Sequence, residues 1–541
     1  MKFFAALLLC VRVCWGFVRE NYGELLTVKP LTSKHVLSTF EFTIDVNDLH
    51  DSSTDDFFDP GYTIVPLQIA RLIKENQVAE MHLRFTRGRW DVELWGEIPK
   101  QGLSSGGTGL ELWSYMPVER DNLHWYQLTN QLSGIFCASL DTIDSTNTYQ
   151  PRLPLQAKVS QPNHAFYFAA LPQESVCTEN LTPFLKLLPC KTKSGIASLI
   201  NQHLLFDTNW HSLSLDILPS NEGERTDGAN VITSTQIVIT IQAVHDVERR
   251  LRRPDKSVFY PPEEECEHYD DNGDRDGEHG KDPLTCLKAI RSPFAVHFYD
   301  FFGMPPKPSC PLSTNEHDVL VVGADKQSEA WYRLSDGRLQ DDVVFTTLQQ
   351  RHPDLVRADY ALTNYGNHWS GISLMLTNPQ PKNYTATAMS QLPWFAHSYL
   401  HTLQVRVNDT LLPKEDVLCQ IAYRPFKDRV HNSFLELQFL LPAFTSVKII
   451  TDFEKSPIKL HEYPPDANRG FDIPPAIISI YDNTTLHSTL RTTSLLLSLP
   501  TPDFSMPYNV IILTSTVMAL TFGSIFNLLV RRFVPLTHDK T

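Results

Sequence analysis

The sequence predicts an α+β fold that is predominantly β, with an α+β amino-terminal half, a β-sandwich-like carboxyl-terminal half and one carboxyl-terminal transmembrane helix. Three observations predict this fold. The first half mixes strand-like and helix-like runs, the second half carries mainly strand-like runs, and an uncharged stretch lies near the carboxyl end. Because 541 residues exceed the usual size of one domain, we expect two domains with their own cores.

The amino-terminal domain is expected to span residues 17–255. In the run EMHLRFT, Met81, Leu83 and Phe85 alternate with polar residues, which is typical of a half-buried strand. The run TQIVITIQAV is rich in β-branched residues, which also favour strands. Apolar residues at helical spacing, as in QIARLI, indicate short amphipathic helices. This mixture favours an α+β domain.

An acidic insert, residues 256–290, is expected to follow. Glu263 to Asp282 contains ten acidic residues and almost no apolar ones, a composition typical of a flexible, solvated segment. The core NGDRDG resembles a calcium-binding loop, but Asn272 stands where Asp is expected and Pro283 where a bidentate Glu should be. We therefore expect a solvated loop here and no metal site.

The carboxyl-terminal domain is expected to span residues 291–507. The runs DVLVVG, LHTLQVRV and SVKIIT favour strands, and in FLELQFLL the residues Leu435, Leu437 and Phe439 alternate with others. Many prolines and the turn-forming SDGR separate these runs. Such a pattern is typical of a β-sandwich.

Both ends of the chain indicate a secretory-pathway membrane protein. Residues 1–16 have one lysine, a short apolar run and small residues before a cleavage point, and we interpret them as a signal peptide; an uncleaved anchor is the alternative. Tyr508 to Val530 holds no charge over a length that crosses a bilayer. Two arginines open the segment 531–541, which we expect to be the cytoplasmic tail. The chain is therefore expected to be a single-pass type I protein.

Cysteines and sequons agree with a lumenal location. Cleavage near Gly16 leaves seven cysteines, an odd number that cannot pair off completely within the chain. Sequons for N-glycosylation are spread along the expected lumenal part. They occur at Asn180, Asn383, Asn408 and Asn483.

Sequence motifs of catalysis are absent. The net charge of −15 argues against nucleic-acid partners. The sequence has no phosphate-binding loop, no nucleophile elbow and no zinc-binding His pair, so we expect no catalytic, cofactor-binding or metal-binding residue. A triad assembled from distant residues cannot be recognised in this way.

Several segments follow one another along the chain and lead directly into the expected membrane helix. They are SGIFCASLDTIDSTNT, VCTENLTPFLKLLPC followed by KSGIASL, PSCPL, LPWFAHSYLHTL and LPTPDFSMPYNVI. Together, and in this order, these segments resemble the PIG-T family, the non-catalytic lumenal subunit of the glycosylphosphatidylinositol (GPI) transamidase complex.

This resemblance implies a complex in the endoplasmic reticulum membrane that attaches GPI anchors to the carboxyl termini of proproteins. The chemistry would belong to a caspase-like catalytic subunit, which the PIG-T subunit holds and stabilises beside the other membrane subunits. The PIG-T subunit would encounter the GPI lipid and the proprotein substrate as part of the complex. A cell-surface adhesion or lectin-like receptor, and a lumenal hydrolase with an unrecognised triad, are the alternatives.

The resemblance also implies partners for the cysteines. In the PIG-T family the cysteine that matches Cys177 forms a disulfide to the caspase-like subunit, whereas the residues alone leave open a bridge to Cys137 or Cys190. We expect Cys190 to pair with Cys310, because both lie in family-like segments flanked by proline. Cys266 and Cys286 are expected to close the acidic insert.

Overall fold

The computed structural model describes residues 20–31, 35–47, 63–153, 158, 161–224, 230–246, 259–260, 294–304, 307–323, 329–334, 342–345, 354–364, 366, 368–464, 466–501 and 505–531. The expected signal peptide, Cys266 and Cys286, and the tail beyond Arg531 lie outside these residues. Two compact units divide the chain, one of Met1–Ser456 with Asp472–Leu495 and one of Pro457–Phe471 with Leu496–Thr541.

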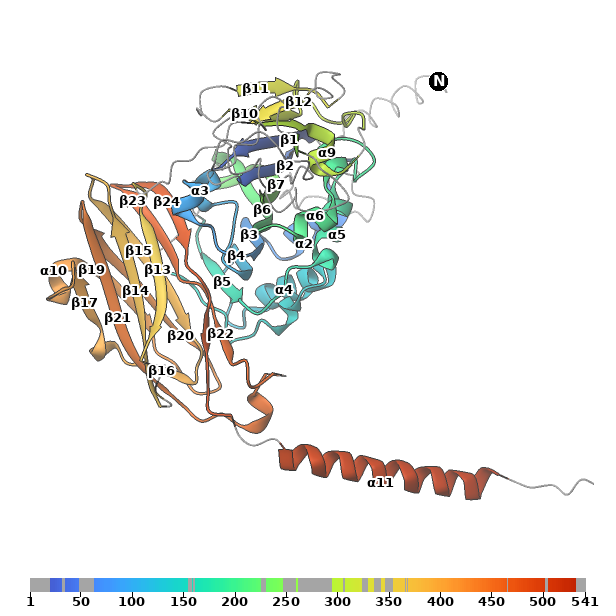
Figure 1. Cartoon of the computed structure of the whole chain (residues 1–541), viewed down its shortest axis with the longest axis vertical. Helices are drawn as coiled ribbons and strands as arrows, with labels where there is room; N and C mark the ends of the chain where they lie inside the picture. Colours follow the sequence, from blue (N-terminus) through green and yellow to red (C-terminus); the bar gives the residue numbers. More distant parts are fainter. Residues whose placement is uncertain are drawn as a thin grey trace, which may run out of the picture. The chain divides into compact units, whose positions relative to one another are not determined.

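A nine-stranded sheet forms the centre of the amino-terminal part of the first unit (Figure 1). Neighbouring strands are antiparallel except where β1 meets β10 in parallel, with Leu26 opposite Val319. The predicted strand in EMHLRFT is β3, and TQIVITIQAV lies in β7. The order across the sheet is β11 (Glu329–Tyr332), β10 (Val319–Val322), β1 (Glu20–Pro30), β2 (His35–Asn47), β7 (Asn230–Asp246), β6 (Trp210–Glu224), β3 (Glu80–Arg87), β4 (Gly109–Pro117) and β5 (His164–Leu171).

Helices cover one face of this sheet and bury its apolar side (Figure 1). Phe85 of β3 packs against Phe136 and Phe184, with ring centroids 6.1 and 5.9 Å away, and so joins the sheet to two helices. The alternation that predicted a strand arises because every second β3 side chain enters this core. The covering elements are α2 (Leu67–Glu75), α4 (Leu123–Phe136), α5 (Thr178–Leu187), η3 (Ile196–Leu199), α6 (Gln202–Phe206) and α9 (Phe298–Phe302).

The first sheet takes strands from beyond the acidic insert. β10 and β11 follow the insert, yet β10 pairs with β1, and the Leu26 amide donates to the carbonyl of Asp318 at 2.8 Å. The domain boundary that we expected at residue 290 is therefore wrong, because the chain returns to the amino-terminal sheet up to Tyr332 before it enters the sandwich.

Two further sheets form a β-sandwich, also within the first unit (Figure 1). The pattern of FLELQFLL is that of β20, which pairs with β15. One sheet has the order β13 (Arg357–Thr363), β14 (Trp369–Asn378), β21 (Thr445–Lys455), β17 (Gln404–Val407) and β18 (Thr410–Leu412), with β16 (Ala396–Ser398) also on β21. The other has the order β19 (Leu418–Arg424), β20 (Ser433–Leu441), β15 (Tyr384–Leu392), β23 (Ile477–Asp482) and β24 (Thr485–Arg491).

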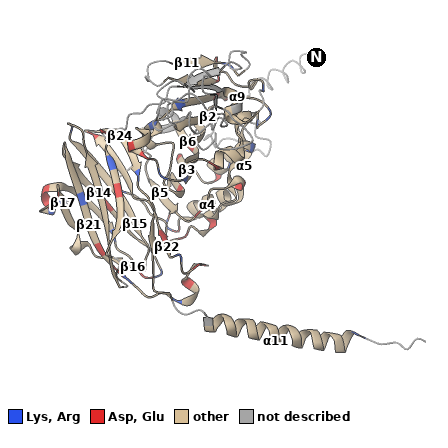
Figure 2. Cartoon of the chain, in the orientation of Figure 1, with Lys and Arg blue, Asp and Glu red and all other residues tan. Residues whose placement is uncertain are grey.

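The second unit carries the helix α11 (Ser505–Val530). Its stretch from Met506 to Val530 has a mean hydropathy of 1.7 and is the one helix, among those the structure describes, that is long and apolar enough to cross a membrane. In Figure 2 no part of its ribbon has the colour of a charged residue, in agreement with its sequence. Five hydroxyl groups, including those of Thr514 and Ser515, donate to carbonyls four residues earlier, so the polar atoms are satisfied within the helix.

Candidate functional site

The candidate site is the junction at which α4 ends and α5 begins, because Cys177 lies there. Cys177 is the N-cap residue of α5, in extended conformation, and its thiol is half-buried and unpaired with another cysteine. Its amide donates to the side-chain oxygen Oδ1 of Asn180 at 2.9 Å, and its thiol contacts the same oxygen at 3.2 Å. The helix start is therefore held by a cysteine and an asparagine three residues later.

Asn180 also holds the end of the preceding helix. Its Nδ2 donates to the carbonyls of Phe136 and Cys137 at 3.0 and 3.2 Å. Cys137 follows α4 in the left-handed region, with φ of 52°, and its thiol is exposed. One buried side-chain amide thus binds the backbones of both Cys177 and Cys137, and Cys137 is one of the two bridge partners that the residues alone leave open for Cys177.

This geometry argues against a glycan on Asn180. The side chain is 1% exposed, and its Nδ2 already uses both hydrogens in bonds to carbonyls. A glycan would replace one of these hydrogens and would need room that the helix junction does not have. The Asn180 sequon therefore lies at a buried helix junction and not on an accessible loop.

The other three sequons lie on loops of the sandwich, two of them on hairpin turns, between β17 and β18 and between β23 and β24. Asn383 lies between β14 and β15, Asn408 between β17 and β18, and Asn483 between β23 and β24, and all three are exposed. Asn408 and Asn483 adopt positive φ, of 47° and 55°, which asparagine tolerates well in tight turns.

The Cys177 thiol is not activated by its surroundings. Burial, followed by a hydrogen bond to Glu179, raises its pKa above the ordinary value. A raised pKa keeps the sulfur protonated at neutral pH, whereas catalytic cysteines need a lowered one. The environment therefore suits a structural thiol or disulfide and not a nucleophile.

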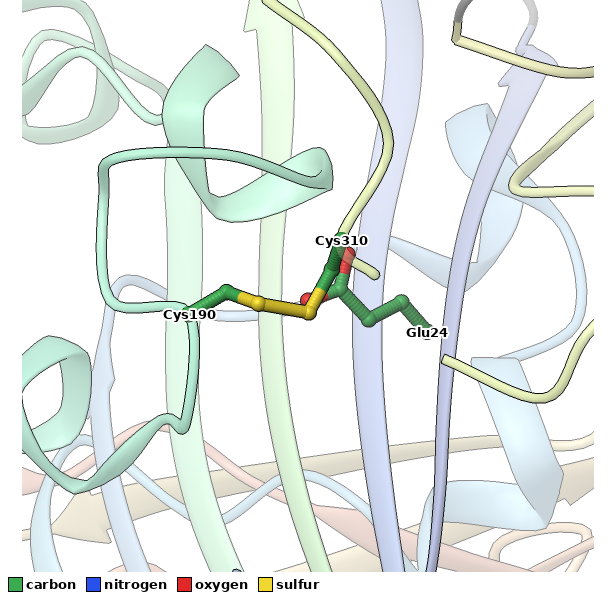
Figure 3. A group of neighbouring side chains, drawn as sticks. All are labelled: Glu24, Cys190 and Cys310. Carbon is green, nitrogen blue, oxygen red and sulfur yellow. A yellow bond between two sulfur atoms is a disulfide. The ribbon is translucent and has the colours of Figure 1, made fainter. Parts of the chain in front are cut away.

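Cys190 and Cys310 are joined in a disulfide, with 6.0 Å between their Cα atoms, on opposite sides of the acidic insert (Figure 3). Glu24 lies beside them, and its carboxylate accepts hydrogen bonds from Tyr22 and from the amide of Ile196 at 2.6 and 2.9 Å. The three side chains are close enough to suggest a metal site, but sulfurs bonded to each other are not metal-binding thiolates. This cluster ties the returning chain to the first sheet.

A serine and a histidine lie together elsewhere, without access to a substrate. Ser38 Oγ is 2.8 Å from His245 Nε2, the geometry of a nucleophile and its base. However, Ser38 is 0% exposed and also contacts the carbonyl of Ala243, so the pair joins β2 to β7 within the fold. It does not make an active site.

Comparison with known proteins identifies the family. The model of a family described as "Gpi16 subunit, GPI transamidase component" matches residues 5–541. The chain belongs to this family. It is 44% identical to the GPI transamidase component PIG-T homolog of Schizosaccharomyces pombe, over 98% of this chain and 94% of that protein.

More distant relatives also match the Gpi16 family chain along almost its whole length. Identity to the GPI transamidase component GPI16 of Saccharomyces cerevisiae is 33%, over 95% of this chain and 89% of that protein. Identity to the human GPI-anchor transamidase component PIGT is 31%, over 95% and 91%.

Sequence reasoning missed the role of Asn180 in this Gpi16 family chain. The segment VCTENL carried two signals, a sequon and an asparagine three residues after a possible helix cap, and only the first was considered.

Proposed function

We propose that this chain is the non-catalytic scaffold subunit of a GPI transamidase in the endoplasmic reticulum membrane. Its family membership supports a role in attaching GPI anchors to proprotein carboxyl termini. The catalytic step would belong to a caspase-like partner. Two features support that division: the Cys177 thiol has a raised pKa, and the neighbouring Ser38 and His245 are buried.

Cys177 is the observation that carries the scaffold role. It caps α5 with a thiol that is neither fully buried nor bonded to another described cysteine. Asn180 fixes its backbone to the end of α4, so the sulfur sits on a rigid junction. A disulfide from such a position would keep the catalytic subunit at high effective concentration beside its scaffold.

The orientation follows from α11 and the glycosylation turns. A single spanning helix followed by arginine would leave the folded part in the lumen. The three exposed sequons on the sandwich would then be available to the glycosylation machinery.

Affinity purification of the full chain from a mild detergent extract tests this function. We expect a caspase-like protease and further membrane subunits to co-purify, and transamidation to survive alanine replacement of each exposed acid, base or thiol that still permits assembly. Purification of the chain alone, or loss of turnover in an intact complex from one such replacement, would overturn the proposal.

A further inference from the structure

Two loops lie side by side at one end of the β-sandwich. Residues 379–383 lead from β14 to β15, and residues 442–444 lead from β20 to β21, so each loop crosses from one sheet to the other. Because β15 pairs with β20 and β14 pairs with β21, the two loops meet where these pairs of strands end.

Hydrogen bonds fix these two loops to each other. The amide of Ala443 donates to Oδ1 of Asn383 at 2.8 Å, and the amide of Phe444 donates to the carbonyl of Gln380 at 3.2 Å. At the end of β14, Nδ2 of Asn378 donates to the carbonyl of Pro442 at 3.0 Å. The two loops therefore form one rigid surface, in which the backbone of Phe444 has a fixed place beside Asn383.

The side chain of Phe444 is unusually exposed for an aromatic residue. It is 68% exposed, more than any other large apolar side chain that the structure describes outside α11, and it makes no ring contact with a described residue. Its backbone is left-handed, with φ of 55°, which is rare and strained for a bulky residue. The protein alone thus leaves this ring without a contact that would offset either its exposure or its strain.

Asn383 is oriented for glycosylation. It is exposed and opens an Asn-X-Thr sequon. Its Oδ1 is bonded to Ala443, whereas its Nδ2, the atom to which a glycan is attached, makes no hydrogen bond to a described residue. Asn180 is the opposite case, because its Nδ2 donates to two carbonyls. The bond from Ala443 uses only the oxygen of Asn383, so it can persist after glycosylation and hold the first sugar close to residues 442–444.

We propose that the first N-acetylglucosamine of a glycan on Asn383 packs against the ring of Phe444. One face of this sugar carries C–H groups, which make favourable contacts with the electron-rich face of an aromatic ring while the sugar hydroxyls stay in water. The bond between Ala443 and Asn383 puts the attachment point one residue from Phe444, and this observation identifies the ligand. The proposal rests on the lumenal orientation proposed above, because only a lumenal asparagine receives such a glycan.

Asn408 is the alternative attachment site. Its Oδ1 accepts from the amide of Ser446 at 2.9 Å, two residues after Phe444. However, β21 lies between β14 and β17 in its sheet, and Asn408 follows β17, whereas the amide of Phe444 is bonded to the β14–β15 loop. A glycan on Asn408 would therefore leave from the other side of β21, and it serves as an internal control.

A protein partner is a less suitable occupant for this ring. On the adjoining loop, Lys382 and Asn383 are exposed and polar, so Phe444 does not lie within a broad apolar patch of the kind that marks a protein interface. A branched glycan attached to Asn383 would also obstruct a flat protein surface beside it.

The test compares how fast glycans are released from Asn383 and Asn408 in the folded full chain. The chain is purified in a mild detergent and treated, without denaturation, with peptide N-glycosidase, which converts each glycosylated asparagine to aspartate. Peptide mass spectrometry then measures the conversion at each site. A sugar packed on Phe444 is shielded from the enzyme, so we expect Phe444→Ala to speed release at Asn383 about 2- to 10-fold, as loss of one aromatic contact predicts. Release at Asn408 is expected to stay unchanged.

Conservative substitutions separate the aromatic face from apolar bulk. Phe444→Tyr keeps the ring and is expected to keep slow release, whereas Phe444→Leu keeps only an apolar side chain and is expected to behave like Phe444→Ala. A double-mutant cycle with Thr385→Val, which removes the sequon but keeps Asn383, gives a second readout. We expect Phe444→Ala to lower the apparent unfolding temperature by roughly 1–3 °C in the glycosylated chain and not in the Thr385→Val chain.

Faster release at Asn383 alone, with slow release kept by tyrosine, would support the proposal. Equal release rates in all variants, equal acceleration at both sites, additive effects in the cycle, or an Asn383 without a glycan would overturn it. Loss of partner subunits in Phe444→Ala with unchanged release would assign the ring to a protein contact and also overturn it. A failure of the proposed orientation is distinguishable, because a chain inserted the other way would carry no glycan at any sequon.

Discussion

Asn180 shows how one side chain can serve two elements. Its Oδ1 accepts a hydrogen bond from the amide of Cys177, the N-cap residue of α5. Its Nδ2 donates to the carbonyls of Phe136 and Cys137 at the end of α4. A sequence pattern contains only the neighbours of a residue along the chain. It therefore identified a sequon at Asn180 and not the hydrogen bonds by which Asn180 joins α4 to α5. The hydrogen bonds to Phe136 and Cys137 depend on tertiary packing and could not be predicted from the sequence.

The burial of Asn180 predicts that its sequon is unused. Thr182→Ala destroys the sequon but leaves the Asn180 hydrogen bonds in place, because the Thr182 hydroxyl is exposed and donates only to the carbonyl of Thr178. We expect the glycan mass removed by an endoglycosidase to stay unchanged. Thr410→Ala is the control, since it removes the sequon of exposed Asn408 and is expected to cost one glycan. A lighter glycan content in Thr182→Ala would contradict the structure.

His211 predicts a loss of stability in acid. Burial, and secondarily Arg87, lower its pKa from 6.5 to about 4. The unfolded chain therefore takes up a proton at this residue below pH 6.5 that the folded chain does not, so the stabilisation present above pH 6.5 is lost as the pH falls toward 4. The loss amounts to roughly 2 kcal/mol by pH 5.

Thermal unfolding between pH 7 and pH 5 measures this effect. We expect His211→Leu to show a smaller decrease in apparent unfolding temperature than the unmodified chain, because the residue can no longer take up a proton. His203→Leu, at an exposed position on α6, serves as the control and should keep the original pH profile. Parallel profiles for His211→Leu and the unmodified chain would refute the assignment.

At the scale of elements, local patterns were sufficient where a segment buries one face. QIARLI became α2, in which Ile69, Leu72 and Ile73 are buried, and EMHLRFT became β3. Both types of element follow from the period of their apolar residues. The helix α11 could also be predicted from the sequence, because its length and its lack of charged residues are properties of the segment alone.

Pairing between distant strands could not be predicted in this way. β10 joins β1 although nearly 300 residues separate Leu26 from Val319. The run DVLVVG indicates a strand but not the sheet to which that strand belongs. Its apolar residues favour burial in a sheet, and they would be buried equally well in either sheet. The acidic insert suggested a domain boundary, yet it interrupts a single sheet.

The helix α11 is predicted to contribute to subunit association beyond anchoring. Gly523 has no side chain to hold a neighbouring helix away, and the hydroxyls of Thr514 and Ser515 donate to carbonyls of their own helix. This part of α11 can therefore pack against another helix without leaving a polar group unsatisfied. A polyleucine helix of equal length should weaken co-purification of the other membrane subunits several-fold. A chimera that restores Thr514, Ser515, Gly523 and Ser524 should recover it. Full retention with polyleucine would leave α11 as a plain anchor.

At the scale of the molecule, the amino-terminal sheet and the sandwich are joined by buried contacts within one unit. Tyr149 stacks on Phe434 with ring centroids 4.1 Å apart, and its hydroxyl binds Glu436, which also accepts from the amide of Leu153 at 2.7 Å. The rigid junction suits a scaffold, whose surface features must keep fixed positions relative to one another. Cys177 is one such feature, and the proposed function depends on what it binds.

The most direct measurement is a non-reducing gel of the full complex probed for this chain and for the caspase-like subunit. The account predicts a heavier band containing both chains, which disappears in Cys177→Ser; serine can still cap α5, so folding is expected to persist. Cys137→Ser and Cys419→Ser, which change the other two free thiols of the described residues, should keep the band. A band that persists in Cys177→Ser, or that never forms with the unmodified chain, would contradict the account.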